Sequence, residues 1–543
     1  GYLTTDGSSV KYAADESAIN AKWVISVSGG SYTIQSAANN KYLNAVLSGL
    51  TDTASAVAMN DVTASITDYR VKYDLRSFDN IAATCADYKI VKIMNKLNPN
   101  IDELMNPVPT QAAIEADILA NITTSHKKVV DFTGNTVEEL NDFLAKNMGS
   151  TVRLTQDINV YYKDNITKIG TILIPSNTIL DGNGHKLVKA GDLPDFGIAF
   201  FYIDKSSGPY KMVYSSNAGV INLKSDLEYT QETVNIMGAD RVYLANNEFK
   251  NAKIYSILMA AEENNNNDLT NYALIKNNVL SDNGMEAIRI VGGHSNIICE
   301  GNTISNLGVY GILVTNNADS TETAVDEVPV TDIPKNIVIK NNNIDNTGRC
   351  PLYFIGAYKS YVTGNKLTNG KMEGICFDYG CVGGYFANNE VSGCGADNTL
   401  PGIAVDTGIY CIIDGNYTHD NVNHGIRLVR GALGTVIVNN NCENNGTEKM
   451  VQDGKLVAGI VIEDASLTEV DNRLDALGSN YNVVYGNTIS GRSTVGVGIM
   501  AEVGTDDCSH NIVKYNIFGK QFTYNLIDLT RGDNEAVNNY VVK

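Results

Sequence analysis

The sequence predicts an all-β fold, a parallel β-solenoid, and three observations carry that prediction. One phrase of apolar strand, Asn, turn, Gly and second apolar strand recurs through residues 182–539, as in "CEGNTISNLGVYGILV" and "VTGNKLTNGKMEGICF". The shortest intervals between successive Asn residues are 23 or 24 positions, which is typical of repeat architectures. Each interval holds short strand patterns and no helical pattern, as one coil of a stacked solenoid requires.

The recurring Asn predicts a ladder inside the solenoid. At a corner between two strands the chain turns sharply through the left-handed region, which Asn tolerates better than most residues. Stacked coils place these side chains about 4.8 Å apart, so their amides can hydrogen-bond along the stack. We therefore expect a structural role for Asn183, Asn247, Asn278, Asn302, Asn342, Asn365, Asn389, Asn416, Asn440, Asn487, Asn516 and Asn539.

Composition narrows the possible partners. The formal net charge of −20 argues against nucleic acid or an anionic membrane as a main partner. No apolar run reaches the ~18 residues of a membrane span. The chain starts at Gly1, and we expect that this is not its natural beginning. The nine Cys residues lack paired metal-site spacings, so we interpret them as small buried apolar residues and expect no metal site of this kind.

The chain divides into three predicted regions. Residues 1–75 alternate polar and apolar positions, as in "AKWVISVSGGSYTIQS", and predict a small accessory domain of antiparallel β-hairpins. Residues 76–130 form a helical linker or cap region, because "DYKIVKIMNKL" and "QAAIEADILANI" have apolar residues at helical spacing. With the hairpins, they give the solenoid a small α+β accessory region. Residues 131–543 form the solenoid itself. Long intervals between Asn positions predict insertions near 188–235, 315–334, 442–456 and 464–478.

A helix is predicted directly before the first regular coil. Thr136 and Glu139 have capping-box spacing, and Gly149 can end the helix in a left-handed conformation. The apolar face of this helix consists of Val137, Leu140, Phe143 and Leu144. Because a solenoid leaves its first coil open to water, we expect this helix to cover the core as an N-terminal cap.

The repeated pattern "G-N-x-I…G-I-x-V" resembles the right-handed parallel β-helix of the pectate-lyase-like superfamily, over roughly residues 150–543. That superfamily includes polysaccharide lyases, glycoside hydrolases, uronate epimerases, inulin fructotransferases and phage tailspikes. The resemblance therefore implies a polysaccharide or oligosaccharide partner and a secreted or cell-surface location, but not a particular reaction. The resemblance also leaves open whether the protein assembles as a homotrimer. The paired-Asp and Arg-Ile-Lys motifs of polygalacturonases and the Asp-Pro-His motif of mannuronan epimerases are absent.

Aligning the second strands by their Gly-Ile pair predicts which side chains stack. Side chains alternate along a strand, so the Ile of each pair and the residue two positions later point inward, as for Ile375 and Phe377. The same alignment pairs Ile460 with Ile499 in the last coils. A column that is nearly all Gly precedes the first inward residue, and we expect it to let a polymer lie close to the backbone.

The outward columns converge on four middle coils. Asp378 and Asp406 occupy equivalent positions on neighbouring coils, with Cβ atoms expected about 5 Å apart. Like charges this close predict that one pKa rises, which would supply an acid and a base. The candidate catalytic residues are Glu373, Asp378, Asp406, His424 and Arg427. The candidate substrate-binding residues are Arg289, Tyr353, Tyr379, Arg430 and Glu463.

Two reactions compete for these residues. A retaining glycoside hydrolase needs carboxyl groups about 5–5.5 Å apart, and an inverting one about 6.5–9.5 Å. A lyase needs a base, Arg427 or His424, and the paired Asp residues would then bind Ca²⁺. The acidic charge and the few outward Lys residues favour a hydrolase, for which no cofactor is expected. The alternative is a non-catalytic glycan-binding, adhesive or tailspike-like β-helix.

Overall fold

The fold was analysed in a computed structural model. The structure describes six short strands before residue 52 and residues 108–542, apart from 127, 162–169, 194–195, 205–210, 228–230, 262–268, 317–329, 465–477, 502–507, 521 and 531. The chain forms two units, Gly1–Thr84 and Cys85–Lys543. The helix predicted around "DYKIVKIMNKL" lies outside the described residues.

The described part of the first unit is antiparallel. Strand β1 (Tyr2–Thr5) pairs with β2 (Val10–Ala13). Strands β3 (Trp23–Ser28), β4 (Ser31–Ser36), β5 (Tyr42–Leu43) and β6 (Leu50–Thr51) form a second small sheet. The hairpin predicted from the alternation around Trp23 is confirmed, because β3 and β4 pair in antiparallel register.

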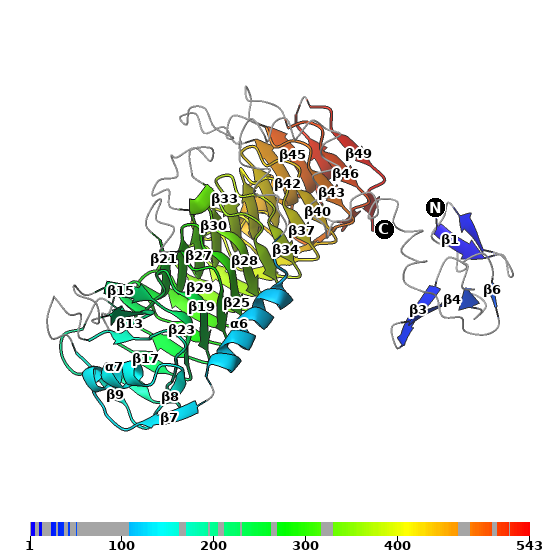
Figure 1. The fold of residues 1–543 in the computed structure, drawn as a ribbon. Helices are drawn as coiled ribbons and strands as arrows, with labels where there is room; N and C mark the ends of the chain where they lie inside the picture. The colour runs from blue at the N-terminus through cyan, green and yellow to red at the C-terminus, as the bar shows by residue number, and fades with distance from the viewer. Residues whose placement is uncertain are drawn as a thin grey trace. The chain divides into compact units, whose positions relative to one another are not determined.

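The second unit is a right-handed parallel β-helix, as predicted, and its strands stack in chain order in Figure 1. The described residues form three parallel sheets, which we call the first, second and third sheet. The first sheet contains β10 (Ile172–Leu173), β13 (Phe196–Ala199), β18 (Glu232–Asn235), β21 (Tyr255–Ala260), β24 (Ile288–Val291), β27 (Ile312–Thr315), β30 (Leu352–Ile355), β33 (Ile375–Asp378), β36 (Ile403–Asp406), β39 (Ile426–Val429), β42 (Ala458–Asp464), β45 (Val495–Ala501) and β48 (Tyr524–Asp528).

The other two sheets complete each coil. The second sheet contains β7 (Lys128–Phe132), β8 (Ser150–Leu154), β11 (Ile179–Asp181), β16 (Ser216–Ile221), β19 (Asp240–Ala245), β22 (Ala273–Lys276), β25 (Ser295–Glu300), β28 (Lys335–Lys340), β31 (Tyr361–Thr363), β34 (Tyr385–Ala387), β37 (Ile412–Asp414), β40 (Val436–Val438), β43 (Val483–Tyr485), β46 (Ile512–Lys514) and β49 (Glu535–Val537). The third sheet contains β9 (Ile158–Val160), β12 (Lys186–Lys189), β17 (Lys224–Asp226), β20 (Glu248–Lys250), β23 (Val279–Ser281), β26 (Thr303–Leu307), β29 (Asn343–Thr347), β32 (Lys366–Gly370), β35 (Glu390–Ser392), β38 (Tyr417–His419), β41 (Asn441–Glu443), β44 (Thr488–Ser490), β47 (Ile517–Phe518) and β50 (Tyr540–Val541).

The register of the first sheet confirms the predicted stacking, with one correction. Ile375 pairs with Ile403 and Phe377 with Val405, and all four side chains are fully buried in one continuous core. In the last coils, however, Ile460 pairs with Val497 and not with Ile499. The slip is two residues, so Ile499 still points inward, because the period of a strand is two.

The Asn ladder is confirmed from Asn247 to Asn539. From Asn247 to Asn516, each side-chain Nδ2 donates to Oδ1 of the next coil's Asn, for example from Asn365 to Asn389 at 2.9 Å. The same Oδ1 also accepts the backbone N–H of Asn365 at 3.0 Å. The left-handed conformation was predicted for the ladder Asn itself. It belongs instead to the residue directly before each ladder Asn, such as Asn388 with φ 54°. Asn183 does have positive φ, but its Nδ2 donates to the Leu154 carbonyl instead.

The Gly column has a different purpose from the one predicted. A Cβ atom at Gly374 would lie 2.2 Å from Val391 Cγ1, and one at Gly459 would lie 2.2 Å from Ile489 Cγ2. These clashes are with core side chains of the third sheet, so the missing side chains would point into the molecule. The column therefore allows close packing at a corner and does not open the surface to a polymer.

Two helices cover the β-helix at and near its beginning. Helix α7 (Val137–Lys146) has the predicted capping box, and Val137, Leu140 and Leu144 are buried in the main core. Helix α6 (Gln111–Ser125) has Thr110 as its N-cap. Its buried Ile114, Ile118 and Ile122 pack against outward apolar residues of the second sheet. In Figure 1, α6 lies along the side of the stacked strands. The sequence predicted the helix but not this position.

The long Asn intervals have two different origins. The interval predicted as an insertion at 188–235 contains β13, β16 and β17 of the regular sheets, so that prediction was wrong for most of its length. Its corner residue is Leu223, whose N–H donates to Asn247 Oδ1, and a hairpin of β14 (Phe201–Asp204) and β15 (Lys211–Tyr214) lengthens the coil. The interval at 442–456 does contain an insertion, the short helix α8 (Glu448–Gln452). Most of the other two predicted insertions lies outside the described residues; the described part of the first includes the 3₁₀ turn η4 (Val330–Asp332).

Eight cysteines lie in the described part of the chain, and all are buried thiols that take part in no disulfide bond there. Several of them, including Cys299 and Cys442, belong to the main core, which confirms their interpretation as small apolar residues. Among the helices that the structure describes, none combines the length and apolar character that crossing a bilayer demands.

Candidate functional site

The candidate site lies on the outward face of the first sheet, at strands β33 and β36. Asp378 and Asp406 end these strands at equivalent positions, one residue beyond the pair formed by Phe377 and Val405. Although Asp378 and Asp406 point outward from the sheet, every residue of the two strands is buried. Each Asp is only 5% exposed. The two carboxyl groups therefore lie in a medium of much lower polarity than water.

Asp378 is buried but well supplied with donors. The Tyr353 hydroxyl donates to Asp378 Oδ2 at 3.0 Å, and the backbone N–H of Tyr379 donates to Oδ1 at 2.8 Å. Burial nevertheless raises the pKa of Asp378 to about 7, against the opposing effect of the Arg430 charge. A raised pKa was predicted from the neighbouring Asp406, but the dominant cause is desolvation. Asp378 therefore titrates near neutral pH.

Asp406 has a different partner from Asp378. Its Oδ2 forms an ion pair with the Arg430 guanidinium, whose side chain is 24% exposed. An opposite charge at contact distance favours the ionised form of a carboxyl group. Arg430 stands at φ 53°, directly after β39, in the left-handed region that a non-Gly residue seldom adopts. Asp406 pairs with Val429, the residue directly before this turn, so the Arg430 guanidinium lies within reach of the Asp406 carboxylate.

Glu373 lies at the edge of the same cluster. It precedes β33, is 8% exposed, and accepts a weak contact from Cys350 Sγ at 3.5 Å. Its charge is among the influences that raise the pKa of Asp378. Tyr353 extends the cluster in the other direction, because its ring centroid lies 5.0 Å from that of Tyr310. Burial raises the pKa of Tyr353 far above its ordinary value, so its hydroxyl stays a hydrogen-bond donor.

The other predicted catalytic residues form a separate cluster on β39 and β42. Arg427 Nε donates to Glu463 Oε2 at 2.6 Å, and His424 Nε2 lies 3.7 Å from Glu463 Oε1. His424 Nδ1 accepts the backbone N–H of Ala458 at 2.9 Å, so a neutral ring carries its hydrogen on Nε2. Burial lowers the pKa of His424, which favours that neutral ring.

Arg289 lies apart from both clusters, towards the N-terminal coils. Its guanidinium stacks over the Tyr255 ring at 5.4 Å and contacts Glu286, which is 1% exposed. Arg349 and Tyr310 make a similar pair at 5.5 Å on a coil nearer the acidic cluster. Arg289 was a predicted substrate-binding residue, whereas Tyr255 and Arg349 were not predicted to belong to a site. In the described part of the chain, no group of His, Cys, Asp and Glu is arranged to hold a metal ion.

One comparison with known protein families supports the fold. Residues 331–476 match the family described as "Right handed beta helix region". No curated protein matches the sequence. Among solved structures, the A-module of mannuronan C-5 epimerase AlgE4 from Azotobacter vinelandii is 13% identical, with a TM-score of 0.38 over 78% of this chain and 97% of that chain.

Two further structures are similar at the same low level. Tailspike protein 3 of bacteriophage CBA120 is 12% identical, with a TM-score of 0.41 over 83% of this chain and 68% of that chain. A GH87 alpha-1,3-glucanase catalytic unit from Streptomyces thermodiastaticus is 10% identical, with a TM-score of 0.43 over 78% of this chain and 69% of that chain. The fold assignment itself follows from the strand register and the family match: this protein is built on a right-handed parallel β-helix.

Proposed function

We propose that this protein degrades a polysaccharide as a glycoside hydrolase, with Asp378 as the general acid and Asp406 as the ionised carboxylate. One observation carries the proposal. Burial raises the pKa of Asp378 to about 7, whereas its neighbour Asp406 is paired with Arg430. Two carboxyl groups whose environments separate their ionisation are the arrangement that glycoside hydrolysis requires.

The chemistry follows from these two states. Asp378 donates its proton to the glycosidic oxygen while the bond from that oxygen to the anomeric carbon breaks. Asp406 either attacks the anomeric carbon or takes a proton from the water that attacks it. Water is added across the bond, and the proton that the water gives up restores the starting ionisation. The partly exposed Tyr353, Tyr379 and Arg430 lie around the acids and would contact the sugar.

Elimination by a lyase has less support from the contacts. A lyase would need His424 or Arg427 as a base, but Arg427 is ion-paired with Glu463. The Nδ1 lone pair of His424 already accepts a backbone N–H. Both groups are therefore engaged in holding the neighbouring coil. We further propose that the enzyme is secreted or displayed on the cell surface, where polymeric glycans are found.

The test is product analysis on a panel of neutral and acidic polysaccharides. We expect new reducing ends without an ultraviolet-absorbing unsaturated product. Asp378→Asn and Asp406→Asn should each lower the rate by about 10²–10⁴-fold, the usual contribution of acid–base groups. Asp226→Asn, which removes an exposed carboxylate on β17 of the third sheet, is the matched control. Full activity in both site variants, or an unsaturated product, would refute the proposal; binding without any product would favour a glycan-binding protein.

A further inference from the structure

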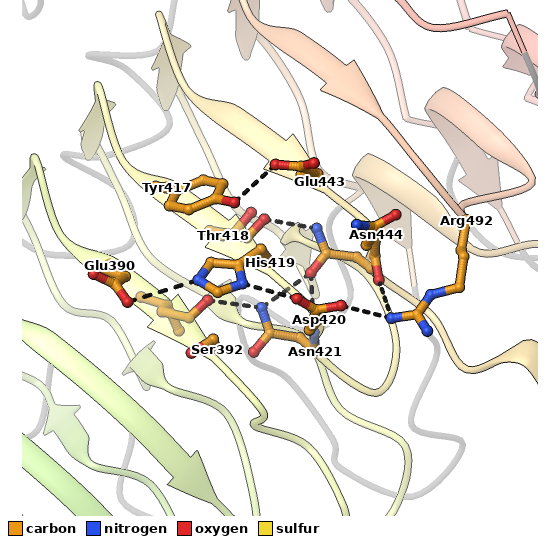
Figure 2. A network of polar contacts seen from close by, with 12 residues as sticks. Glu390, Ser392, Tyr417, Thr418, His419, Asp420, Asn421, Glu443, Asn444 and Arg492 are labelled. Carbon is orange, nitrogen blue, oxygen red and sulfur yellow. Dashed lines mark hydrogen bonds and ion pairs between the residues drawn. The ribbon is translucent and has the colours of Figure 1, made fainter.

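A second face of the β-helix carries a network of polar side chains that the proposed reaction does not use. Figure 2 shows it on β35, β38 and β41 of the third sheet. His419 contacts Glu390 at 3.7 Å through Nε2 and Asp420 at 2.9 Å through Nδ1. The His419 ring is stacked on Tyr417, with centroids 4.2 Å apart. The network therefore holds Asp420 from one side.

Asp420 in turn fixes one arginine. Arg492 donates from one terminal nitrogen to Asp420 Oδ1 at 2.6 Å and to the Asn444 carbonyl at 3.1 Å. Figure 2 shows the Arg492 guanidinium in contact with both groups, Asn444 one coil away and Asp420 two coils away. A guanidinium has five N–H donors, so these two bonds leave others for a ligand. Because its position is already determined, less side-chain entropy is lost when a ligand binds.

The arginine borders a recess made by the inserted helix. A pocket of about 330 Å³ is lined by Asn444, Glu448, Val451, Gln452, Gly491 and Arg492. Helix α8 forms one wall, and it is anchored by its N-cap Thr447, which accepts the Met450 N–H at 3.2 Å, and by the buried Met450 side chain. The insertion predicted from the sequence at 442–456 thus forms one wall of a recess beside the third sheet.

We propose that this recess is a glycan-binding site for a neutral sugar ring, separate from the acidic pair. The volume lies at the lower end of the range for small-molecule sites. Amide, carboxylate and guanidinium groups are planar and can each contact two adjacent hydroxyls. Glu448 and Asp420 carry two negative charges and Arg492 carries one positive charge, so the three groups have a net charge of −1, which disfavours an anionic sugar. The proposal rests on the proposed function only for the choice of glycan as ligand.

The site would hold a polymer on the third sheet while the acids act on the first. This arrangement predicts that substitutions in the recess weaken glycan binding without changing the acids that cleave the polymer. Gln452 and Arg492 line the recess, whereas Lys449 is exposed on the same helix and is not among the lining residues. Gln452→Ala and Lys449→Ala are therefore matched variants of one helix.

The experiment is calorimetric titration of the full chain with neutral gluco-, manno-, galacto- and xylo-oligosaccharides and with their uronate counterparts. The background carries Asp378→Asn, so that no ligand is consumed. We expect saturable binding of a neutral member, weakened about 10-fold by Gln452→Ala and by Arg492→Ala, and unchanged by Lys449→Ala.

Three results would overturn the inference: no binding of any neutral member, binding that Gln452→Ala and Arg492→Ala leave unchanged, or binding of uronates alone. Failure of the proposed function is distinguishable. If only the proposed function fails, binding of the neutral oligosaccharide persists and depends on Gln452. The protein without the Asp378→Asn substitution then releases no reducing ends. Conversely, cleavage that depends on Asp378 together with absent binding at the recess would refute only this inference.

Discussion

The outward faces of the first and third sheets carry the same kinds of side chain but place them in different surroundings. Each face combines acids, an arginine, a histidine and a tyrosine. On the first sheet, Asp378 and Asp406 are 5% exposed, and burial raises the pKa of Asp378 to about 7. On the third sheet, the Asp420 side chain is 51% exposed. Burial, rather than residue type, is therefore what distinguishes the two faces.

The largest difference is expected between two ion pairs. The Arg430–Asp406 pair is 24% and 7% exposed, whereas the Lys366–Glu390 pair on the third sheet is 55% and 38% exposed. Arg430→Gln should lower the free energy of unfolding by about 3 kcal/mol, because it removes the guanidinium charge from beside the buried Asp406 carboxylate. Lys366→Gln should lower it by less than about 1 kcal/mol. Denaturant unfolding at pH 7 measures both, and equal effects would contradict the comparison.

The second prediction concerns stability and pH on the first sheet. The pKa of Asp378 is about 7 in the folded protein and ordinarily 3.8. Between these two pH values, Asp378 is therefore protonated in the folded state and ionised in the unfolded state. The stability that protonated Asp378 contributes to the folded state should therefore be fully present below about pH 4 and be lost as the pH rises towards 7. Thermal unfolding from pH 4 to 8 should show less of this loss in Asp378→Asn than in the unsubstituted protein. Parallel curves would argue against a buried, protonated Asp378.

His424 should act in the opposite direction. Burial lowers its pKa below the ordinary 6.5, so the unfolded chain binds a proton that the folded ring does not. The stability that depends on this neutral ring is present above about pH 6.5 and falls as the pH drops. His424→Gln should remove this acid-side loss, measured by denaturant unfolding at pH 5 and pH 7. A larger loss at pH 5 in the variant would contradict the assignment.

The smallest effect is expected on the third sheet. The hydrogen bond from the Tyr417 hydroxyl to Glu443, at 2.7 Å, raises the pKa of Tyr417 to about 12. Glu443→Gln should bring that pKa closer to its ordinary value of 10.0 and change stability by less than about 1 kcal/mol. The tyrosine titration can be followed by NMR with Tyr417→Phe to assign the signal. An unchanged pKa would show that Glu443 is not its main cause.

Much of the fold was predictable because it repeats. The Asn spacing identified the coils, and the two-residue period of a strand placed Asp378 beside Asp406 even before the register was known. The same period explains why pairing Ile460 with Ile499 still gave the correct inward face. Leu223 shows the limit: a coil without its Asn was interpreted as an insertion.

The candidate site was predictable in composition but not in environment. The sequence contains no direct signal that the outward residues of β33 and β36 are buried. Their burial depends on how side chains of the neighbouring coils, such as Tyr353 and Arg430, lie against them. The contact between Arg430 and Asp406 depends on a left-handed residue that strand patterns do not reveal. The third-sheet network was missed because only the second strands were aligned. The alternation of Tyr417 and His419, followed by the insertion at 442–456, was the available signal.

The side-chain amides of the Asn ladder all point the same way along the axis of the β-helix. From Asn247 to Asn539, each side-chain amide oxygen accepts hydrogen bonds from the preceding coil. From Asn247 to Asn516, each side-chain amide nitrogen donates to the Asn of the following coil. The small dipoles of these amides therefore add along the axis instead of cancelling, and neighbouring bonds polarise one another. Stacked coils thus form a polar column inside an apolar core, and its two ends are chemically different.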